Sequence, residues 1–167
     1  VGPYINTSVF RHILETNNCF QDLLCQVRDE SLEAYAYGSC TFEDIVRHCF
    51  PRNYADQQMT LPVMLSVQTF PMDIIDFPEL RLQVKYPRYV SIPTALSFTF
   101  WPSGKTMMCS LEYNKGLWKD STALRMIERF INIVEQVVTN YKKPISNLDI
   151  LPRREKTLIL KNWANGR

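Results

Sequence analysis

The chain has 167 residues, of which 46% are hydrophobic and 22% are charged, a composition typical of a globular protein. Nineteen Lys and Arg residues against 17 Asp and Glu residues leave a formal net charge of +2, too small to indicate a nucleic-acid or anionic-membrane partner. A chain of this length fits one domain and can bury one core without disulfides or a structural metal.

The cysteines and the apolar runs indicate the compartment. Five cysteines without Cys-x-x-Cys spacing are typical neither of a disulfide framework nor of a zinc site, so we expect reduced, mostly buried thiols. No apolar run approaches the roughly 20 residues of a transmembrane helix, and no signal peptide is visible. We therefore expect a cytoplasmic protein. Because the sequence starts without Met, we also expect it to be a piece of a longer polypeptide.

The N-terminal part of the chain predicts a strand and then a helix. Side chains alternate between two faces from Tyr4 to His12, a pattern typical of a strand. Apolar residues at helical spacing predict a helix that starts at residue 18 and is ended by Gly38. An asparagine at position 17 or 18 supplies the expected cap.

The next stretch predicts a short helix, a loop and a strand. Thr41 and Asp44 have capping-box spacing, which predicts a helix whose inward face includes Cys49. Residues 52–60 are polar and are expected to form a surface loop. Residues 61–70 have the composition of a strand.

The central region predicts a hairpin. Residues 71–80 contain two prolines and are expected to be irregular, and residues 82–86 alternate weakly as in a short strand. Residues 94–101 and 106–113 flank a turn, residues 102–105, that contains glycine. Two β-like runs around such a turn are typical of an antiparallel hairpin.

The C-terminal part predicts the clearest helix, over residues 120–140, followed by a break at Pro144. Residues 145–151 are expected to be a docking segment, and Pro152 starts a last short amphipathic helix. The order of strand, helices, strands and helix predicts a mixed α+β fold with a layer of helices against one sheet.

Side chains able to carry catalysis are scarce. His12 and His48 are the only histidines, and neither has a neighbouring Asp or Ser arrangement that suggests a triad. No spacing of His or Cys fits a metal site. Asn6 stands out because Asn is unfavourable within a strand and its amide can both donate to and accept from a thioester or amide. The alternative is a structural Asn satisfied by neighbouring backbone.

Several stretches resemble motifs of the condensation domains of nonribosomal peptide synthetases, in the family's order. Residues 2–11 resemble the family's Gly-Pro-Phe-Val-Asn-Thr-x-Pro-x-Arg stretch, and residues 41–46 look like its Tyr-Pro-Phe-Glu region. Residues 110–114 are similar to its Leu-Glu-Tyr-Asn hairpin exit. Residues 144–151 are similar to the linker that leads into an adenylation domain.

The resemblance implies a C-terminal lobe of a condensation domain over residues 1–143 and a linker toward a downstream adenylation domain over residues 144–167. The implied fold is an α/β sandwich, a mixed sheet with helices on one face, which is one half of a chloramphenicol acetyltransferase-like pseudo-dimer. In that family, phosphopantetheine arms of peptidyl carrier proteins enter a tunnel between two lobes, and an acceptor amine attacks the donor thioester. The implied partners are the N-terminal lobe, carrier proteins and the adenylation domain, with no nucleic acid and no membrane.

The family's catalytic motif, His-His, three spacers and Asp-Gly, lies in the N-terminal lobe, and this chain has no adjacent histidines. The resemblance therefore implies no catalytic residue, no metal and no directly bound cofactor here, and a lobe that is inactive alone. It implies that Tyr4, Asn6 and Arg11 line the tunnel, with Asn6 nearest the chemistry and Arg11 as a supporting charge. Residues 71–93 are expected to reach toward the other lobe.

The departures from the family pattern leave alternatives open. Ser8-Val9 stands where the family has Leu-Pro, and residues 37–41 replace its His-Gln-Asp-Tyr-Pro. These differences are compatible with a degenerate member, so the alternative is a non-catalytic condensation-like platform that binds a carrier or tailoring protein. A third alternative is an unrelated α+β protein.

Overall fold

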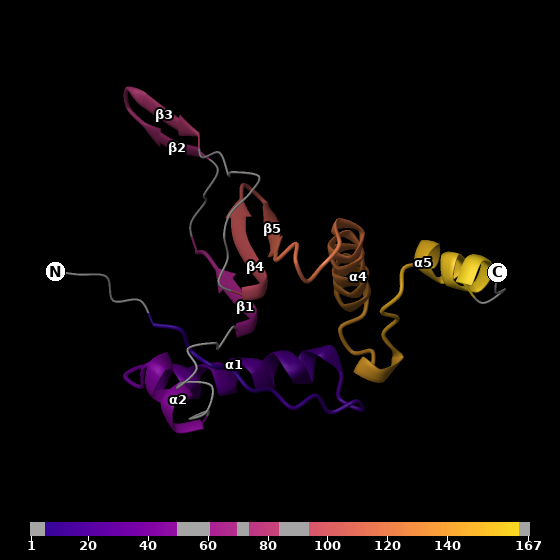
Figure 1. The fold of residues 1–167 in the computed structure, drawn as a ribbon, viewed down its shortest axis with the longest axis horizontal. Coiled ribbons are helices and arrows are strands. Elements are labelled where there is room, and N and C mark those ends of the chain that lie inside the picture. Colours follow the sequence, from indigo (N-terminus) through magenta and orange to yellow (C-terminus); the bar gives the residue numbers. More distant parts are fainter. Residues whose placement is uncertain (1–5, 50–60, 70–73, 84–93, 164–167) are drawn as a thin grey trace. The chain divides into compact units, whose positions relative to one another are not determined.

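The computed structural model of the chain divides into two compact units (Figure 1). The first unit comprises residues 1–59 and 128–167, and the second comprises residues 60–127. Helix α4 (Asp120–Thr139) runs through the boundary and belongs to both. The structure describes residues 6–49, 61–69, 74–83 and 94–163.

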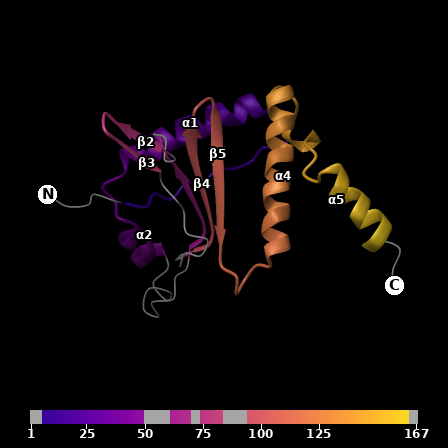
Figure 2. The same ribbon diagram turned by 90° about the horizontal axis from the view of Figure 1, so that it is seen from above.

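The second unit is built on a mixed sheet of order β1-β4-β5, and Figure 2 shows β4 and β5 side by side. Strand β1 (Leu61–Val67) runs parallel to β4 (Thr94–Ser103), and β4 pairs with the antiparallel strand β5 (Thr106–Tyr113). The central strand β4 contributes the buried side chains of Leu96 and Trp101. The mixed sheet and the helices confirm the expected α/β class.

The expected hairpin is the β4–β5 pair, and it is tighter than the sequence indicates. Both strands extend into the expected turn, so that only Gly104 and Lys105 connect them. Gly104 has a φ of 59°, a left-handed conformation that glycine adopts without the steric cost of a Cβ. The turn glycine therefore fixes the register in which Ser103 pairs with Thr106.

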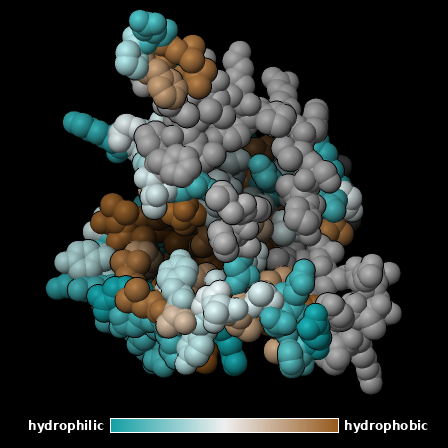
Figure 3. Space-filling view, turned by 90° about the vertical axis from the view of Figure 1, so that its left-hand side faces the viewer, coloured by the Kyte–Doolittle hydropathy of each residue, from teal (hydrophilic) through white to brown (hydrophobic). Residues whose placement is uncertain are grey.

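The expectation of irregular structure over residues 71–80 is wrong for its described part. Strands β2 (Ile74–Phe77) and β3 (Leu80–Gln83) pair antiparallel and form a separate two-stranded sheet. Pro78 follows β2 directly and occupies the turn, where its fixed φ is favourable, so it ends a strand instead of preventing one. Phe77, Leu80 and Leu82 are exposed on this hairpin. The hairpin lies at the top of Figure 3, where hydrophobic side chains are visible in brown.

The first unit begins with the two expected helices, α1 (Phe20–Ala36) and α2 (Phe42–Cys49). The cap of α1 is Cys19, not an asparagine, because the Asp22 carboxylate accepts the Cys19 backbone N–H at 3.0 Å. This bonding to Cys19 lowers the pKa of Asp22. The cap of α2 is as expected, since the Asp44 N–H donates to Thr41 Oγ1 at 3.2 Å.

Two other expectations differ from the structure. Residues 6–12, the described part of the expected first strand, form no strand, because Asn6 directs its hydrogen bonds to the turn between α1 and α2.

The cysteine thiols are free as expected but are not mostly buried, since Cys19 is half-buried and the others are exposed. Cys49 in particular is exposed, and the buried residue of α2 is Val46. The expected loop over residues 52–60 lies outside the described residues.

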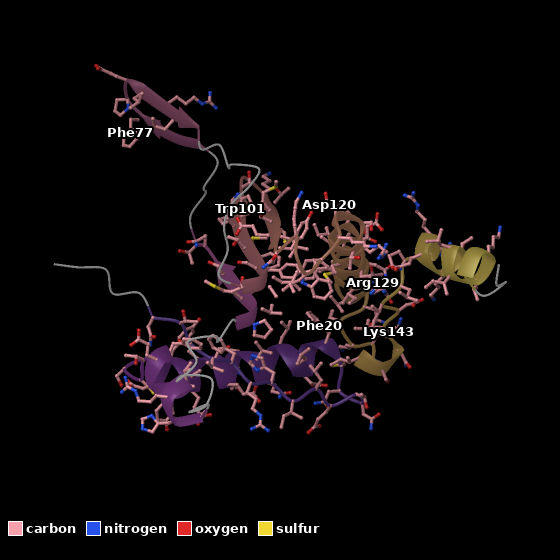
Figure 4. The ribbon with its side chains drawn as sticks, in the orientation of Figure 1. Phe20, Phe77, Trp101, Asp120, Arg129 and Lys143 are labelled. Atoms are coloured by element: carbon pink, nitrogen blue, oxygen red, sulfur yellow. The ribbon has the colours of Figure 1, made fainter. Side chains whose placement is uncertain are left out.

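The C-terminal segment of the first unit is bonded to α4, as the expected docking segment requires. It consists of η1 (Ile145–Asn147), α5 (Arg153–Leu158) and η2 (Ile159–Trp163). Arg129 donates two hydrogen bonds to the Glu155 carboxylate, at 2.9 and 2.5 Å, and Figure 4 shows Arg129 on the part of α4 near α5. The Glu155 side chain is only 3% exposed, so this bidentate ion pair compensates its burial.

A second set of contacts fastens the same segment around Asp149. Gln136 donates to the Asp149 carbonyl at 2.8 Å and accepts the Asp149 backbone N–H at 3.0 Å. The Asp149 carboxylate is paired with Lys156, and this hydrogen bond lowers the pKa of Asp149. The segment after α4 is therefore held by α4 side chains at two points, Glu155 and Asp149.

No helix in the described ranges combines the length and hydrophobicity needed to cross a membrane.

Replacing Arg129 by methionine should destabilise the chain because it removes the bidentate ion pair that Arg129 forms with the buried Glu155 carboxylate. The Arg129 side chain is 39% exposed, so water screens part of the loss, and we expect a decrease of about 2–3 kcal/mol in the free energy of unfolding. Urea denaturation measures this value. The control Arg154→Met, at an exposed position on the same segment, should change it by less than about 0.5 kcal/mol. Equal losses in both variants would contradict the role of the ion pair.

Candidate functional site

The first described residue, Asn6, is clamped onto the turn between α1 and α2. Its Nδ2 donates to the carbonyls of Gly38 and Cys40, at 3.1 and 2.9 Å, and its Oδ1 accepts the Phe42 N–H at 3.2 Å. Both amide hydrogens and the amide oxygen therefore have backbone partners. The Asn6 side chain is a structural link between two parts of the first unit that are more than 30 residues apart in sequence.

His12 is fixed against the middle of α1. Its Nδ1 is hydrogen-bonded to Glu30 Oε2, while Gln26 Nε2 donates to Glu30 Oε1 at 2.9 Å and to the Ile13 carbonyl at 3.0 Å. The hydrogen bond from His12, followed by that from Gln26, lowers the pKa of Glu30. His12 thus has a carboxylate partner that lies 18 residues away in the sequence.

Aromatic contacts hold the same part of the segment. The Phe10 ring stacks with the His12 ring, with centroids 6.2 Å apart, and meets the Tyr35 ring edge-on at 5.6 Å. Such ring contacts limit the rotamers available to Phe10 and His12. Residues 10–13 are therefore positioned on α1 by ring packing and by hydrogen bonds together.

A surface hollow of about 370 Å³ lies between this segment and α1. The α1 residues that line it are spaced three or four positions apart, so they lie on one face of the helix. The volume lies at the lower end of the range of small-molecule sites. The lining residues are Val9, Phe10, Arg11 and His12 from the segment and Glu30, Glu33, Ala34 and Tyr37 from α1.

The charged groups in this hollow differ in how they are bonded. Glu30 is engaged by His12 and Gln26. Arg11 and Glu33 are exposed, and within the described residues neither forms a hydrogen bond or an ion pair. As far as the described residues show, the hollow therefore presents one guanidinium and one carboxylate without a charged partner, which makes it the candidate functional site of the first unit.

The structure describes two of the three residues, Asn6 and Arg11, that the resemblance places in a substrate tunnel. Tyr4 lies outside the described residues. Asn6 has the backbone-satisfied geometry of the structural alternative, and Arg11 lines the hollow. Their role in a tunnel stays a prediction. Sequence reasoning missed Glu33 and Tyr37, which line the hollow because they share a face of α1 with Glu30, and no local motif marks them.

The second histidine, His48, does not line the hollow. His48 lies on α2, and its Nδ1 is 2.7 Å from the Asp44 carbonyl one turn earlier, so it is bonded within its own helix. Among the described residues, no group of three or more His, Cys, Asp and Glu side chains is arranged to hold a metal ion.

Comparison with known proteins identifies the family. The family model described as Condensation domain matches residues 1–160, nearly the whole chain. The chain belongs to the condensation-domain family. This confirms the resemblance of its motifs to those of condensation domains. Residues 8–9 and 37–41 are therefore places where a member of the family differs from the family's usual motifs.

The relatives of this condensation-domain chain are large synthetases. A linear gramicidin synthase of Brevibacillus parabrevis is 28% identical over 98% of this chain, which spans 3% of that relative. A dimodular nonribosomal peptide synthase of Bacillus subtilis (strain 168) is 27% identical over 99% of the chain, which spans 7% of it. The chain therefore spans only a small part of these relatives.

A solved structure shares the fold. It is a complex of the X-domain and OxyB from teicoplanin biosynthesis, and it superposes with a TM-score of 0.62 at 21% identity. The match covers 81% of this chain and 30% of the other. At this identity, the match supports the condensation-like α/β fold and nothing further.

The His12–Glu30 contact should depend on pH. Because the contact lowers the pKa of Glu30 below its ordinary value of 4.5, its stabilisation is present above pH 4.5 and is lost as the pH falls through the lowered value. Chemical shifts of the Ile13 and Glu30 amides, followed from pH 7 to pH 3, should show this step. Glu30→Gln should abolish the step, whereas Glu33→Gln, which keeps the contact, should retain it. A step that persists in Glu30→Gln would contradict the assignment.

Proposed function

We propose that this chain is the C-terminal lobe of a condensation domain that forms peptide bonds between carrier-bound acyl and aminoacyl thioesters. The observation that carries the proposal is the family match over residues 1–160 in a chain without adjacent histidines. The proton-handling residue of the reaction then belongs to the N-terminal lobe. Residues 1–143 form the lobe, and residues 144–167 form the linker toward an adenylation domain.

The lobe contributes a wall of the reaction chamber. Tyr4, Asn6 and Arg11 belong to one short segment that is fixed at Asn6 and at His12. Because Asn6 holds this segment on the α1–α2 turn, it acts as a positioning residue for the wall. Arg11 supplies a positive charge to the same wall. Phosphopantetheine arms of carrier proteins deliver the substrates, so the lobe needs no resident cofactor, and the reaction takes place in the cytoplasm.

Two further features support the partners named in this proposal. The contacts of Arg129 and Gln136 fix the segment after α4 on the lobe, which suits a linker that must deliver the next domain at a defined position. The β2–β3 hairpin exposes Phe77, Leu80 and Leu82. A two-stranded hairpin is marginally stable alone in water, so apolar contacts with the N-terminal lobe would stabilise it.

The second candidate function is a non-catalytic platform for a carrier or tailoring protein. It is favoured by the solved structure with the same fold, which is described as a complex of an X-domain with OxyB. The substitution of Ser8-Val9 for the family's Leu-Pro pair also favours it. The two functions differ in whether the intact domain forms a peptide product.

Activity of the parts distinguishes these functions. The chain alone should form no product from aminoacyl and peptidyl carrier substrates, and the chain joined to its N-terminal lobe should form product. Mass spectrometry of the carrier-bound species measures both. Product formed by the chain alone would contradict the lobe assignment, and a folded intact domain without product would favour the platform.

In the intact domain, Asn6→Ala should lower the rate of peptide formation about 10- to 100-fold, since the loss of three hydrogen bonds displaces the wall of the chamber. The matched control is Asn17→Ala, at an exposed position in the same segment, and it should leave the rate unchanged. Equal rates in both variants would show that the Asn6 contacts do not position the reacting groups.

A further inference from the structure

The polar groups of the hollow along α1 leave one unbalanced charge of each sign. The Glu30 carboxylate is occupied on both oxygens, by His12 and by Gln26. Arg11 and Glu33 line the same hollow and have no hydrogen-bonding partner in the part of the chain that the structure describes. An arginine and a glutamate that border one cavity without pairing can each bind an opposite charge on a ligand.

This charge pattern decides the class of ligand. A phosphate or other polyanion would meet Arg11 but also the carboxylates of Glu30 and Glu33, which lowers its affinity. A polyamine would meet Glu33 but also Arg11. A molecule with one anionic and one cationic group can satisfy both free side chains, because opposite charges then face each other at both ends. The hollow thus selects a small zwitterion.

The arrangement of His12 adds a third polar contact. When its neutral ring donates Nδ1–H to Glu30, its Nε2 is left as a hydrogen-bond acceptor. An ammonium group carries three hydrogens and can donate to this nitrogen and to the Glu33 carboxylate at once. The Glu30–Gln26 contacts hold the imidazole in place before any ligand arrives, which reduces the entropy lost on binding.

The apolar part of the lining accommodates a side chain. Val9, Phe10 and Ala34 supply aliphatic and aromatic surface, and the Phe10 ring is fixed by its contacts with His12 and Tyr35. We propose that the hollow binds a free α-amino acid with an apolar side chain. Arg11 binds its carboxylate, Glu33 and His12 bind its ammonium group, and Phe10 packs on its side chain.

This site shares Arg11 with the proposed wall of the reaction chamber, but its test is separate from that of the peptide-bond chemistry. A free amino acid has no thioester, and its binding requires neither the N-terminal lobe nor a carrier protein. A binding measurement on the chain therefore tests the site, whereas product formation tests the condensation function. Either result leaves the other unchanged.

The test uses the whole isotope-labelled chain and L-phenylalanine, followed by amide chemical shifts at pH 7. We expect saturable shifts at residues 9–12 and 30–37, with a dissociation constant in the millimolar range. L-Phenylalaninamide lacks the carboxylate, and N-acetyl-L-phenylalanine lacks the ammonium group. The affinity of each for the chain should be lower than that of L-phenylalanine by a factor of about ten or more. No saturable shift in these residues, or equal binding of all three compounds, would overturn the proposal.

Matched variants assign the contacts. Arg11→Gln and Glu33→Gln should each weaken L-phenylalanine binding about tenfold or more, because each removes a charge-assisted contact. Arg154→Gln and Glu128→Gln change exposed residues outside the hollow and should bind as the unchanged chain does. Circular dichroism checks that each variant is folded, and the comparison of the three ligands on the unchanged chain does not depend on any variant. Unchanged binding in both hollow variants would overturn the proposal.

Discussion

The geometry of the candidate site depends on the three hydrogen bonds of Asn6. They join the start of the chain to the turn that ends α1, and they use both donor positions and the oxygen of one amide. The His12–Glu30 contact fixes the same segment six residues later. Between these two attachments the chain has little freedom, so residues 9–12 are kept over one face of α1 and the hollow has a defined wall.

Local patterns in the sequence predict much of the fold because their physical causes are local. The Thr41–Asp44 cap, the turn at Gly104 and the apolar face of α4 each depend on residues within a few positions of one another. The first expected strand failed for the opposite reason. Its alternation is real, but Asn6 bonds to a turn more than 30 residues away, and a pattern of period two does not encode that partner.

The same distinction applies to the candidate site. Asn6 and Arg11 stand out in the sequence through their chemistry and through the family resemblance. The partner of His12 lies 18 residues away, and the role of Glu33 follows only from the path of the N-terminal segment across α1. Spacing on α1 places Glu30 and Glu33 on one face, but it does not say which segment covers that face.

The parallel pairing of β1 with β4 has a consequence for how the chain folds. Leu61 pairs with Thr94, 33 positions later, whereas Ser103 pairs with Thr106 across a tight turn. Closing the longer loop costs more conformational entropy before its contacts form. We expect the β4–β5 ribbon to nucleate the sheet and β1 to dock late, so that pulse-labelling hydrogen exchange would protect the β5 amides before those of β1.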